Sequence, residues 1–146
     1  MNRLPILIYA AIAVSSYILG AIYLFSPTFM PYHAVAVGEE WSAVAEGYRV
    51  LIGALLDVAG GGWLALALSL TALIAVPIRR GERWARYAAP LIILAFNIPT
   101  GWATITVLTQ SPASPPWYGP VGTCVAALLA VLIDRPWRNP ETKPTN

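Results

Sequence analysis

A single carboxylate, Asp57, stands inside the apolar run that spans residues 47–76. A run of this length can cross a bilayer, and a carboxylate within it must face protein or water because contact with lipid is costly. Gly53, Gly60 and Gly61 share a helix face with Asp57, and such a stripe of small residues allows another helix to approach closely. We therefore expect Asp57 to lie inside a bundle of membrane helices.

Polar side chains on neighbouring segments are predicted at the depth of Asp57. At 1.5 Å per helical residue, Asp57 lies about 13 Å below an outer boundary placed at Tyr48. Arg49 lies two turns above it on nearly the same face. The side chains at the same depth in the neighbouring antiparallel helices are found by counting residues from the outer ends of those helices. With Asp57 and Arg49 they form a predicted ligand site, which consists of Asp57, Arg49, Tyr17, Ser16, Asn97 and Thr100.

Two interpretations fit this group of residues. In the functional one, a polar pocket open to the outside holds a small ligand, a proton or a cation. In the structural one, hydroxyl groups and close packing on the glycine face hold a buried acid. Replacing Asp57 by Asn separates them, since lost binding at unchanged stability supports the first interpretation and collapse of the fold supports the second.

A metal site is a weaker candidate, in the loop of residues 26–47. His33 with Glu39, Glu40 and Glu46 could supply nitrogen and oxygen ligands to a divalent ion. Their spacing matches neither HExxH nor a paired-histidine signature, and a lone loop histidine is usually a hydrogen-bonded surface residue. We therefore expect no metal and no other cofactor. Cys124 is the only cysteine, which excludes an intrachain disulfide.

The composition assigns the chain to the membrane class. Only 11% of its 146 residues are charged and its mean hydropathy is +0.63, whereas soluble domains carry about 25% charged residues. The arginines follow the pattern that sets membrane topology, so we expect contact with a lipid bilayer and none with nucleic acid.

Four apolar segments predict an all-α, membrane-embedded four-helix bundle that forms a single domain over residues 1–146. The expected helices span about 4–25, 48–76, 86–110 and 120–133, with a mobile tail at about 139–146. In the first outer loop, Trp41, Val44, Ala45 and Tyr48 recur at helical spacing opposite Glu39, Glu40, Ser42 and Glu46. This pattern predicts a short amphipathic helix at the outer interface.

Eight of the nine basic residues fall on one side of this arrangement, and only Arg49 falls on the other. The positive-inside rule then places both termini and the arginine-rich turn, residues 79–86, in the cytoplasm. The expected location is the bacterial plasma membrane, which the chain would cross several times.

The body of the chain, residues 4–133, resembles small bacterial four-helix membrane proteins that are broadly DoxX-like. The resemblance rests on the polar start of the second segment at Tyr48-Arg49, on its glycine-rich interior, and on the turn Arg79-Arg80-Gly81-Glu82-Arg83-Trp84-Ala85-Arg86. It implies the architecture and little about function.

Three functions are compatible with these observations. The first is binding of a small or lipidic molecule, or of a partner, in an outward-facing intramembrane pocket near Asp57. The second is a membrane enzyme or proton-coupled transporter that uses Asp57, so whether the chain catalyses a reaction is left open. The third is a structural subunit that docks a partner helix, or a second copy of the chain, on the face of Gly53, Gly60 and Gly61.

Overall fold

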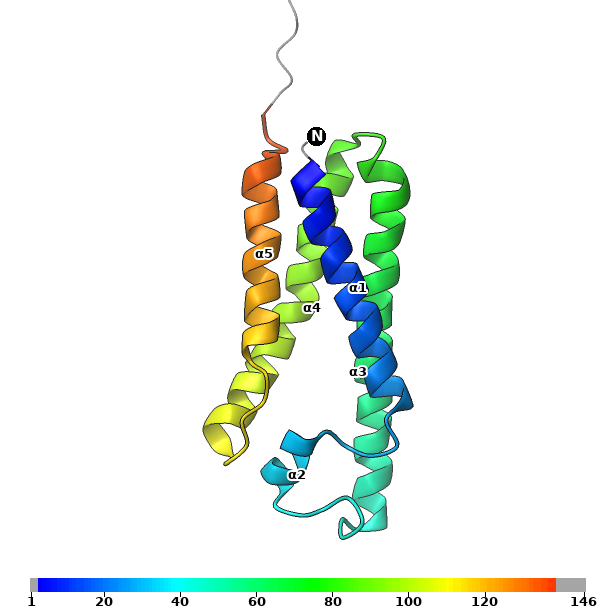
Figure 1. The fold of residues 1–146 in the computed structure, drawn as a ribbon, viewed down its shortest axis with the longest axis vertical. Coiled ribbons are helices and arrows are strands. Elements are labelled where there is room, and N and C mark those ends of the chain that lie inside the picture. The colour runs from blue at the N-terminus through cyan, green and yellow to red at the C-terminus, as the bar shows by residue number, and fades with distance from the viewer. Residues whose placement is uncertain (1–2, 139–146) are drawn as a thin grey trace, which may run out of the picture.

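The computed structural model describes residues 3–138, which form helices, turns and loops without any strand. Four helices run side by side, namely α1 (Arg3–Phe25), α3 (Glu46–Leu73), α4 (Arg83–Gln110) and α5 (Tyr118–Asp134) (Figure 1). A short helix, α2 (Pro31–Val37), lies in the first loop, and a π-helical turn, η1 (Ile74–Ile78), extends α3. The all-α prediction is confirmed for these residues, and the predicted tail at 139–146 lies outside them.

Three helical runs are long and apolar enough to cross a membrane, and they are α1, Glu46–Ile78 and α4. Helix α5 has 17 residues and is shorter. Large apolar side chains are exposed around the outside of the helices, among them Leu7, Val14, Val58, Leu91, Ile98, Leu128 and Leu132. An exterior of this kind suits contact with lipid, since monomeric soluble proteins rarely expose large apolar patches.

The two ends of the molecule differ in character. The start of α1, the turn between η1 and α4, and the end of α5 lie together at what we call the arginine end (Figure 1). The loops that follow α1 and α4 lie at the opposite end, which we call the loop end. The arginine end takes its name from Arg3, Arg79, Arg80, Arg83, Arg86, Arg135 and Arg138.

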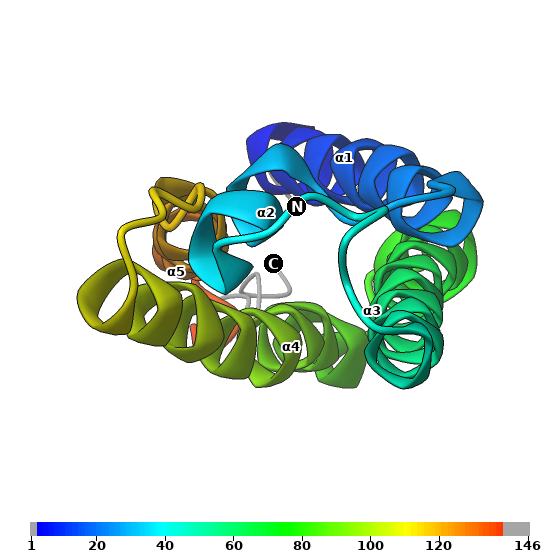
Figure 2. The same cartoon turned by 90° about the horizontal axis from the view of Figure 1, so that it is seen from below.

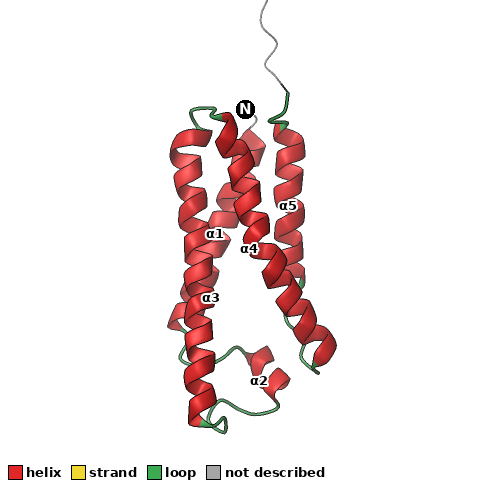
Figure 3. Cartoon of the chain, turned by 180° about the vertical axis from the view of Figure 1, so that it is seen from behind, coloured by secondary structure: helices red, strands yellow, loops and turns green. Residues whose placement is uncertain are grey.

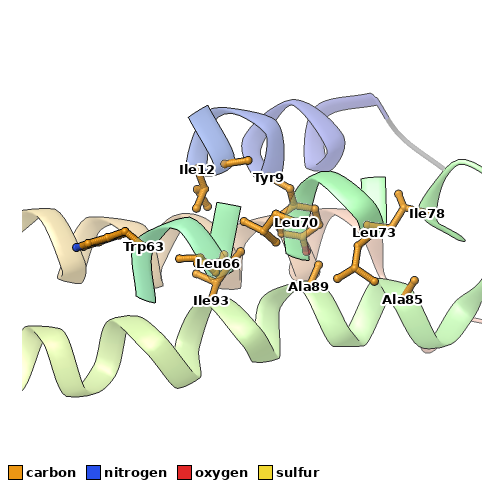
Figure 4. Close-up of a cluster of buried hydrophobic side chains, with 13 residues drawn as sticks. Tyr9, Ile12, Trp63, Leu66, Leu70, Leu73, Ile78, Ala85, Ala89 and Ile93 are labelled. Atoms are coloured by element: carbon orange, nitrogen blue, oxygen red, sulfur yellow. The ribbon is translucent and has the colours of Figure 1, made fainter. Parts of the chain in front are cut away.

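The half of the molecule near the arginine end has a solid core (Figure 4). Small side chains on α4, such as Ala85 and Ala89, allow the larger side chains of α1 and α3 to fill the interior. The buried set includes Tyr9, Ile12, Leu66, Leu70, Leu73, Ile78 and Ile93.

The half near the loop end is more open. Helix α1 packs mainly on α3 and α4 mainly on α5, whereas α3 and α4 touch less. Pro99 lies inside α4 and cannot donate to the carbonyl of Ala95, which predicts a kink there. Figure 3 shows the half of α4 near the loop end leaning away from α3. The two pairs of helices therefore diverge towards the loop end.

A short helix forms in the first loop, but the prediction of its position was wrong. The helix spans Pro31–Val37, residues 41–44 form a turn, and Tyr48 already belongs to α3. Pro31 suits a first helical turn, and Gly38, with a φ of 81°, ends the helix. The apolar residues of the predicted face serve tertiary packing instead, because Val44 and Trp41 pack with Phe29 and Leu56.

Candidate functional site

The prediction that Asp57 is buried inside the bundle was wrong, because its side chain is exposed. It borders a small surface hollow of about 210 Å³ beside Tyr23, Ser26, Thr28 and Trp41. These neighbours belong to the last turn of α1 and to the loop that follows it. Asp57 is therefore at the loop end of the molecule.

The error arose from the register between α1 and α3. A Cβ atom added to Gly60 would lie 3.1 Å from the backbone oxygen of Gly20, so these two glycines stand at the same level. Asp57 is one turn closer to the loop end than Gly60, which places it level with the end of α1. Aligning Tyr48 with the end of α1 had instead placed Asp57 beside Ser16 and Tyr17.

The other predicted site residues do not converge on Asp57. Ser16 is buried, and its hydroxyl donates to the Ile12 carbonyl at 2.8 Å. The hydroxyl of Tyr17 lies 3.3 Å from that of Thr71, which is towards the arginine end. Arg49 is half-buried near the start of α3.

Asn97 and Thr100 both lie on α4, away from Asp57. Asn97 is 1% exposed, and its Nδ2 donates to the Ile93 carbonyl at 3.0 Å, while its Oδ1 has no partner among the described residues. The hydroxyl of Thr100 donates to the Phe96 carbonyl at 2.7 Å. The structure brings two of the predicted residues, Ser16 and Thr100, to the wall of one cavity.

This cavity has a volume of about 460 Å³ and lies mainly between α1, α4 and α5. Its wall also includes Trp63 from α3 and Tyr32 from α2. No charged side chain is among the described residues that line it. The lining consists of Ala11, Ile12, Ser15, Ser16, Leu19, Tyr23, Tyr32, Trp63, Thr100, Thr104, Pro116, Gly119, Pro120, Gly122, Thr123 and Ala126.

Two glycines, Gly119 and Gly122, leave part of the α5 wall of the cavity without side chains. A Cβ atom added to Gly119 or Gly122 would meet no atom within 4 Å. These glycines differ from Gly20 and Gly60, where an added Cβ would come within 2.7 Å of a leucine side chain of the neighbouring helix. The first pair borders open space, whereas the second pair allows two helices to touch.

The hydroxyl groups of the α4 and α5 walls bond to their own helices. Thr104 donates to the Gly101 carbonyl, and Thr123 donates to the Gly119 carbonyl, both at 2.9 Å. Because each hydroxyl oxygen also carries lone pairs, it can still accept a hydrogen bond from a molecule in the cavity. The polar groups of these walls are therefore mainly acceptors.

Helix α2 lies at the loop end, in front of the ends of the long helices in the view of Figure 2. The hydroxyls of Tyr32 on α2 and Tyr23 on α1 are 2.9 Å apart, and both rings line the cavity. Burial, and then the hydrogen bond with Tyr23, raise the pKa of Tyr32 well above its ordinary value of 10.0. Tyr32 therefore stays uncharged at neutral pH.

The residues predicted as possible metal ligands, His33, Glu39, Glu40 and Glu46, do not form a cluster that could hold a metal ion. Among residues 3–138, no group of three His, Cys, Asp or Glu side chains is arranged to hold a metal ion. The Nδ1 atom of His33 accepts a hydrogen bond from the Met30 amide at 3.2 Å. The structure thus gives His33 a role in starting α2 and does not join it to Glu39 or Glu40.

Sequence reasoning missed an ion pair at the arginine end. The Nε of Arg86 donates to Oδ2 of Asp134 at 2.6 Å, and its Nη2 donates to the Asp134 carbonyl at 2.9 Å. The Asp134 side chain is only 3% exposed, so the pair is largely removed from solvent. An available signal was the antiparallel course of the last two helices, which brings the start of one to the end of the other.

No protein-family model, curated protein or solved structure matches the chain. The DoxX-like resemblance therefore stays a prediction.

Proposed function

We propose that this protein binds a small, uncharged and largely apolar molecule of lipidic character in the cavity between α1, α4 and α5. The observation that carries the proposal is a cavity of about 460 Å³ whose described lining is apolar except for hydroxyl groups and one indole. Pockets for small molecules typically enclose about 300–1,000 Å³ and are mostly apolar with a few polar groups. A charged ligand would find no counter-ion in this wall.

The cavity replaces Asp57 as the centre of the binding hypothesis. Asp57 lies at the surface of the loop end, whereas the wall of the cavity contains Ser16 and Thr100. Tyr32 of α2 contributes to its wall, so the cavity reaches towards the loop end, in agreement with the idea of an outward-facing pocket.

The same proposal places the protein in the bacterial plasma membrane, crossed by α1, α3, α4 and α5. Three of these helical runs have the length and hydropathy of membrane spans. Helix α5 is about 26 Å long at 1.5 Å per residue, a few ångströms less than a typical hydrocarbon layer of about 30 Å. The gathering of arginines at one end supports a cytoplasmic location for that end and for both termini.

The test adds a side chain to the part of the α5 wall that Gly119 and Gly122 leave bare. We expect Gly122→Leu to weaken binding of undecan-2-one at least tenfold, because the new side chain enters space that is open at this position. The matched control is Gly61→Leu, since Gly61 is exposed and an added Cβ there also meets nothing within 4 Å. Binding is measured by titration and native mass spectrometry of protein released from bilayer nanodiscs. Equal binding by the wild type and both variants would refute the proposal.

One observation favours the docking of a partner helix as a second function. Gly61 is exposed on α3, and an added Cβ at Gly61 or at Gly53 would meet no atom of this chain. Gly60 is not available, because it contacts α1. Disulfide trapping of a Gly61→Cys variant in membranes, with Cys124 replaced by Ala, tests whether this face meets a second copy. A proton-exchanging role for Asp57 in transport or catalysis remains a separate hypothesis.

A further inference from the structure

We infer that the molecule bound in this cavity carries a neutral oxygen acceptor, a carbonyl or a hydroxyl, and that this oxygen accepts a hydrogen bond from the indole N–H of Trp63. The inference rests on the proposed function and adds the chemical class of the ligand. It assigns Trp63, which the sequence did not single out, as the residue that recognises the polar group.

Trp63 is held rigidly at the wall of the cavity. Its side chain is only 9% exposed, and its ring packs edge-on against Phe96 with centroids 4.7 Å apart and an interplanar angle of 69°. Figure 4 shows the indole nitrogen at the tip of the side chain that is turned away from Leu66 and Leu70. The ring therefore closes the solid core on one side and borders the cavity on the other.

The indole N–H has no hydrogen-bond partner among the described residues. The indole nitrogen is not among the fully buried polar atoms without a partner, so it is open to the cavity, where an acceptor on a ligand can reach it. Several other hydroxyls of the lining are already used as donors, since those of Ser16 and Thr100 donate to carbonyls of their own helices. The other donors that the lining offers are the hydroxyl of Ser15 and the second hydroxyl of the Tyr23–Tyr32 pair, and Trp63 is distinguished from them by a ring packed against Phe96.

The wall also indicates that the acceptor is neutral. A carboxylate or phosphate at Trp63 would have one N–H as its partner and no cation among the lining residues, so its burial would be strongly unfavourable. A ketone or ester carbonyl needs only the indole donor. A hydroxyl can accept from the indole and donate to a hydroxyl oxygen of the wall.

The test compares two probes that differ in a single oxygen, undecan-2-one and undecane, in nanodiscs. We expect the wild type to bind the ketone about threefold to tenfold more tightly than the alkane, which is the range for one hydrogen bond. Trp63→Phe should abolish this preference while the alkane still binds, because Phe retains an aromatic ring against Phe96. The control is Trp102→Phe, since Trp102 is exposed on α4 and should leave the preference intact.

A measurement on the unaltered protein decides the question if Trp63→Phe does not fold. The indole N–H resonance that Trp63 contributes to the NMR spectrum should move when undecan-2-one is added, and should move much less with undecane. Equal affinity for the two probes together with an unmoved resonance would overturn the assignment to Trp63 and leave the proposed function standing. Absence of binding by either probe would contradict both proposals.

Discussion

Gly20 of α1 and Gly60 of α3 face each other so closely that a Cβ atom on Gly60 would lie 3.1 Å from the Gly20 carbonyl oxygen and 2.7 Å from Cγ of Leu24. Membrane helices gain much of their association energy from such close approach of small residues, since lipid competes for apolar contacts. This contact sets the register of α1 against α3, and the positions of Asp57 and Trp63 follow from it.

A matched pair of substitutions tests this contact. We expect Gly60→Ala to lower the free energy of unfolding by about 1–3 kcal/mol, because the added methyl group meets backbone atoms of α1. Gly61→Ala should be neutral or stabilise by up to about 1 kcal/mol, because its space is open and Ala favours the helix. Titration with SDS in detergent micelles measures both. Equal effects at the two positions would contradict the register described above.

Asp57 gives a second prediction, which follows from its exposure. Asp57→Asn should change the free energy of unfolding by no more than about 0.5 kcal/mol, as is usual for surface substitutions. It should also leave undecan-2-one binding unchanged, because Asp57 does not line the cavity between α1, α4 and α5. The same SDS titration and nanodisc assay provide the measurements. A large loss of stability would show that the carboxylate is shielded by the bundle after all.

The sequence predicted the helices better than their mutual arrangement. Long apolar runs mark the spans, because hydrophobic length is a property of each segment alone. The position of Asp57 along the bundle depends instead on which residues of α1 and α3 are in contact. Gly60 and Gly122 look alike in the sequence, yet one is a packing contact and the other borders a cavity. Only the positions of the neighbouring helices distinguish these two uses of glycine.

Part of the cavity could have been foreseen. Pro99 predicted a departure of α4 from a straight course, and Thr100 and Thr104, which follow it, both line the cavity. The contribution of Tyr32 could not be foreseen, because the predicted loop helix was placed ten residues too late. The role of Trp63 depends on its unpartnered N–H, which is a property of the packed structure.

The Arg86–Asp134 pair predicts a strong dependence of stability on both partners. Asp134→Ala should lower the free energy of unfolding by about 3–5 kcal/mol, because it leaves a guanidinium without its partner in a largely enclosed place. Replacing both residues by Leu should recover most of that loss, since no unpaired charge then remains. A double-mutant cycle by SDS titration yields the coupling between them. Additive effects of the single substitutions would mean that the pair does not stabilise the contact of α4 with α5.

A substitution of Asn97 tests whether this residue is a structural part of the core or a contact of the ligand. Its Oδ1 has no partner among the described residues, and an unsatisfied buried acceptor costs about 1–3 kcal/mol. Asn97→Leu should therefore raise the free energy of unfolding by about 1 kcal/mol. Binding of undecan-2-one should be unchanged, because Asn97 does not line the cavity. Lost binding by a folded Asn97→Leu protein would restore Asn97 to the site in which the sequence analysis placed it.

His33 makes the start of α2 sensitive to acid. Its Nδ1 can accept the Met30 N–H only while that nitrogen is unprotonated, and burial lowers the pKa of His33 below its ordinary value of 6.5. The rings of Phe29 and Tyr32 pack against it, and the α3 residues that share its small groove are apolar, so no described carboxylate there stabilises the imidazolium.

The sign of the pH effect follows from that lowered pKa. Above pH 6.5 the imidazole is neutral in the folded and the unfolded chain, and the stabilisation of α2 is fully present. As the pH falls below 6.5, the unfolded chain takes up the proton first, so stability is lost progressively until the folded-state pKa is passed. We expect the Met30 amide to exchange hydrogen faster at pH 5 than at pH 7.5, after correction for the intrinsic rate. His33→Gln keeps an acceptor at the third helical position, as in a capping box, and should remove this pH dependence. Exchange that responds equally to pH in the wild type and in His33→Gln would exclude His33 as its cause.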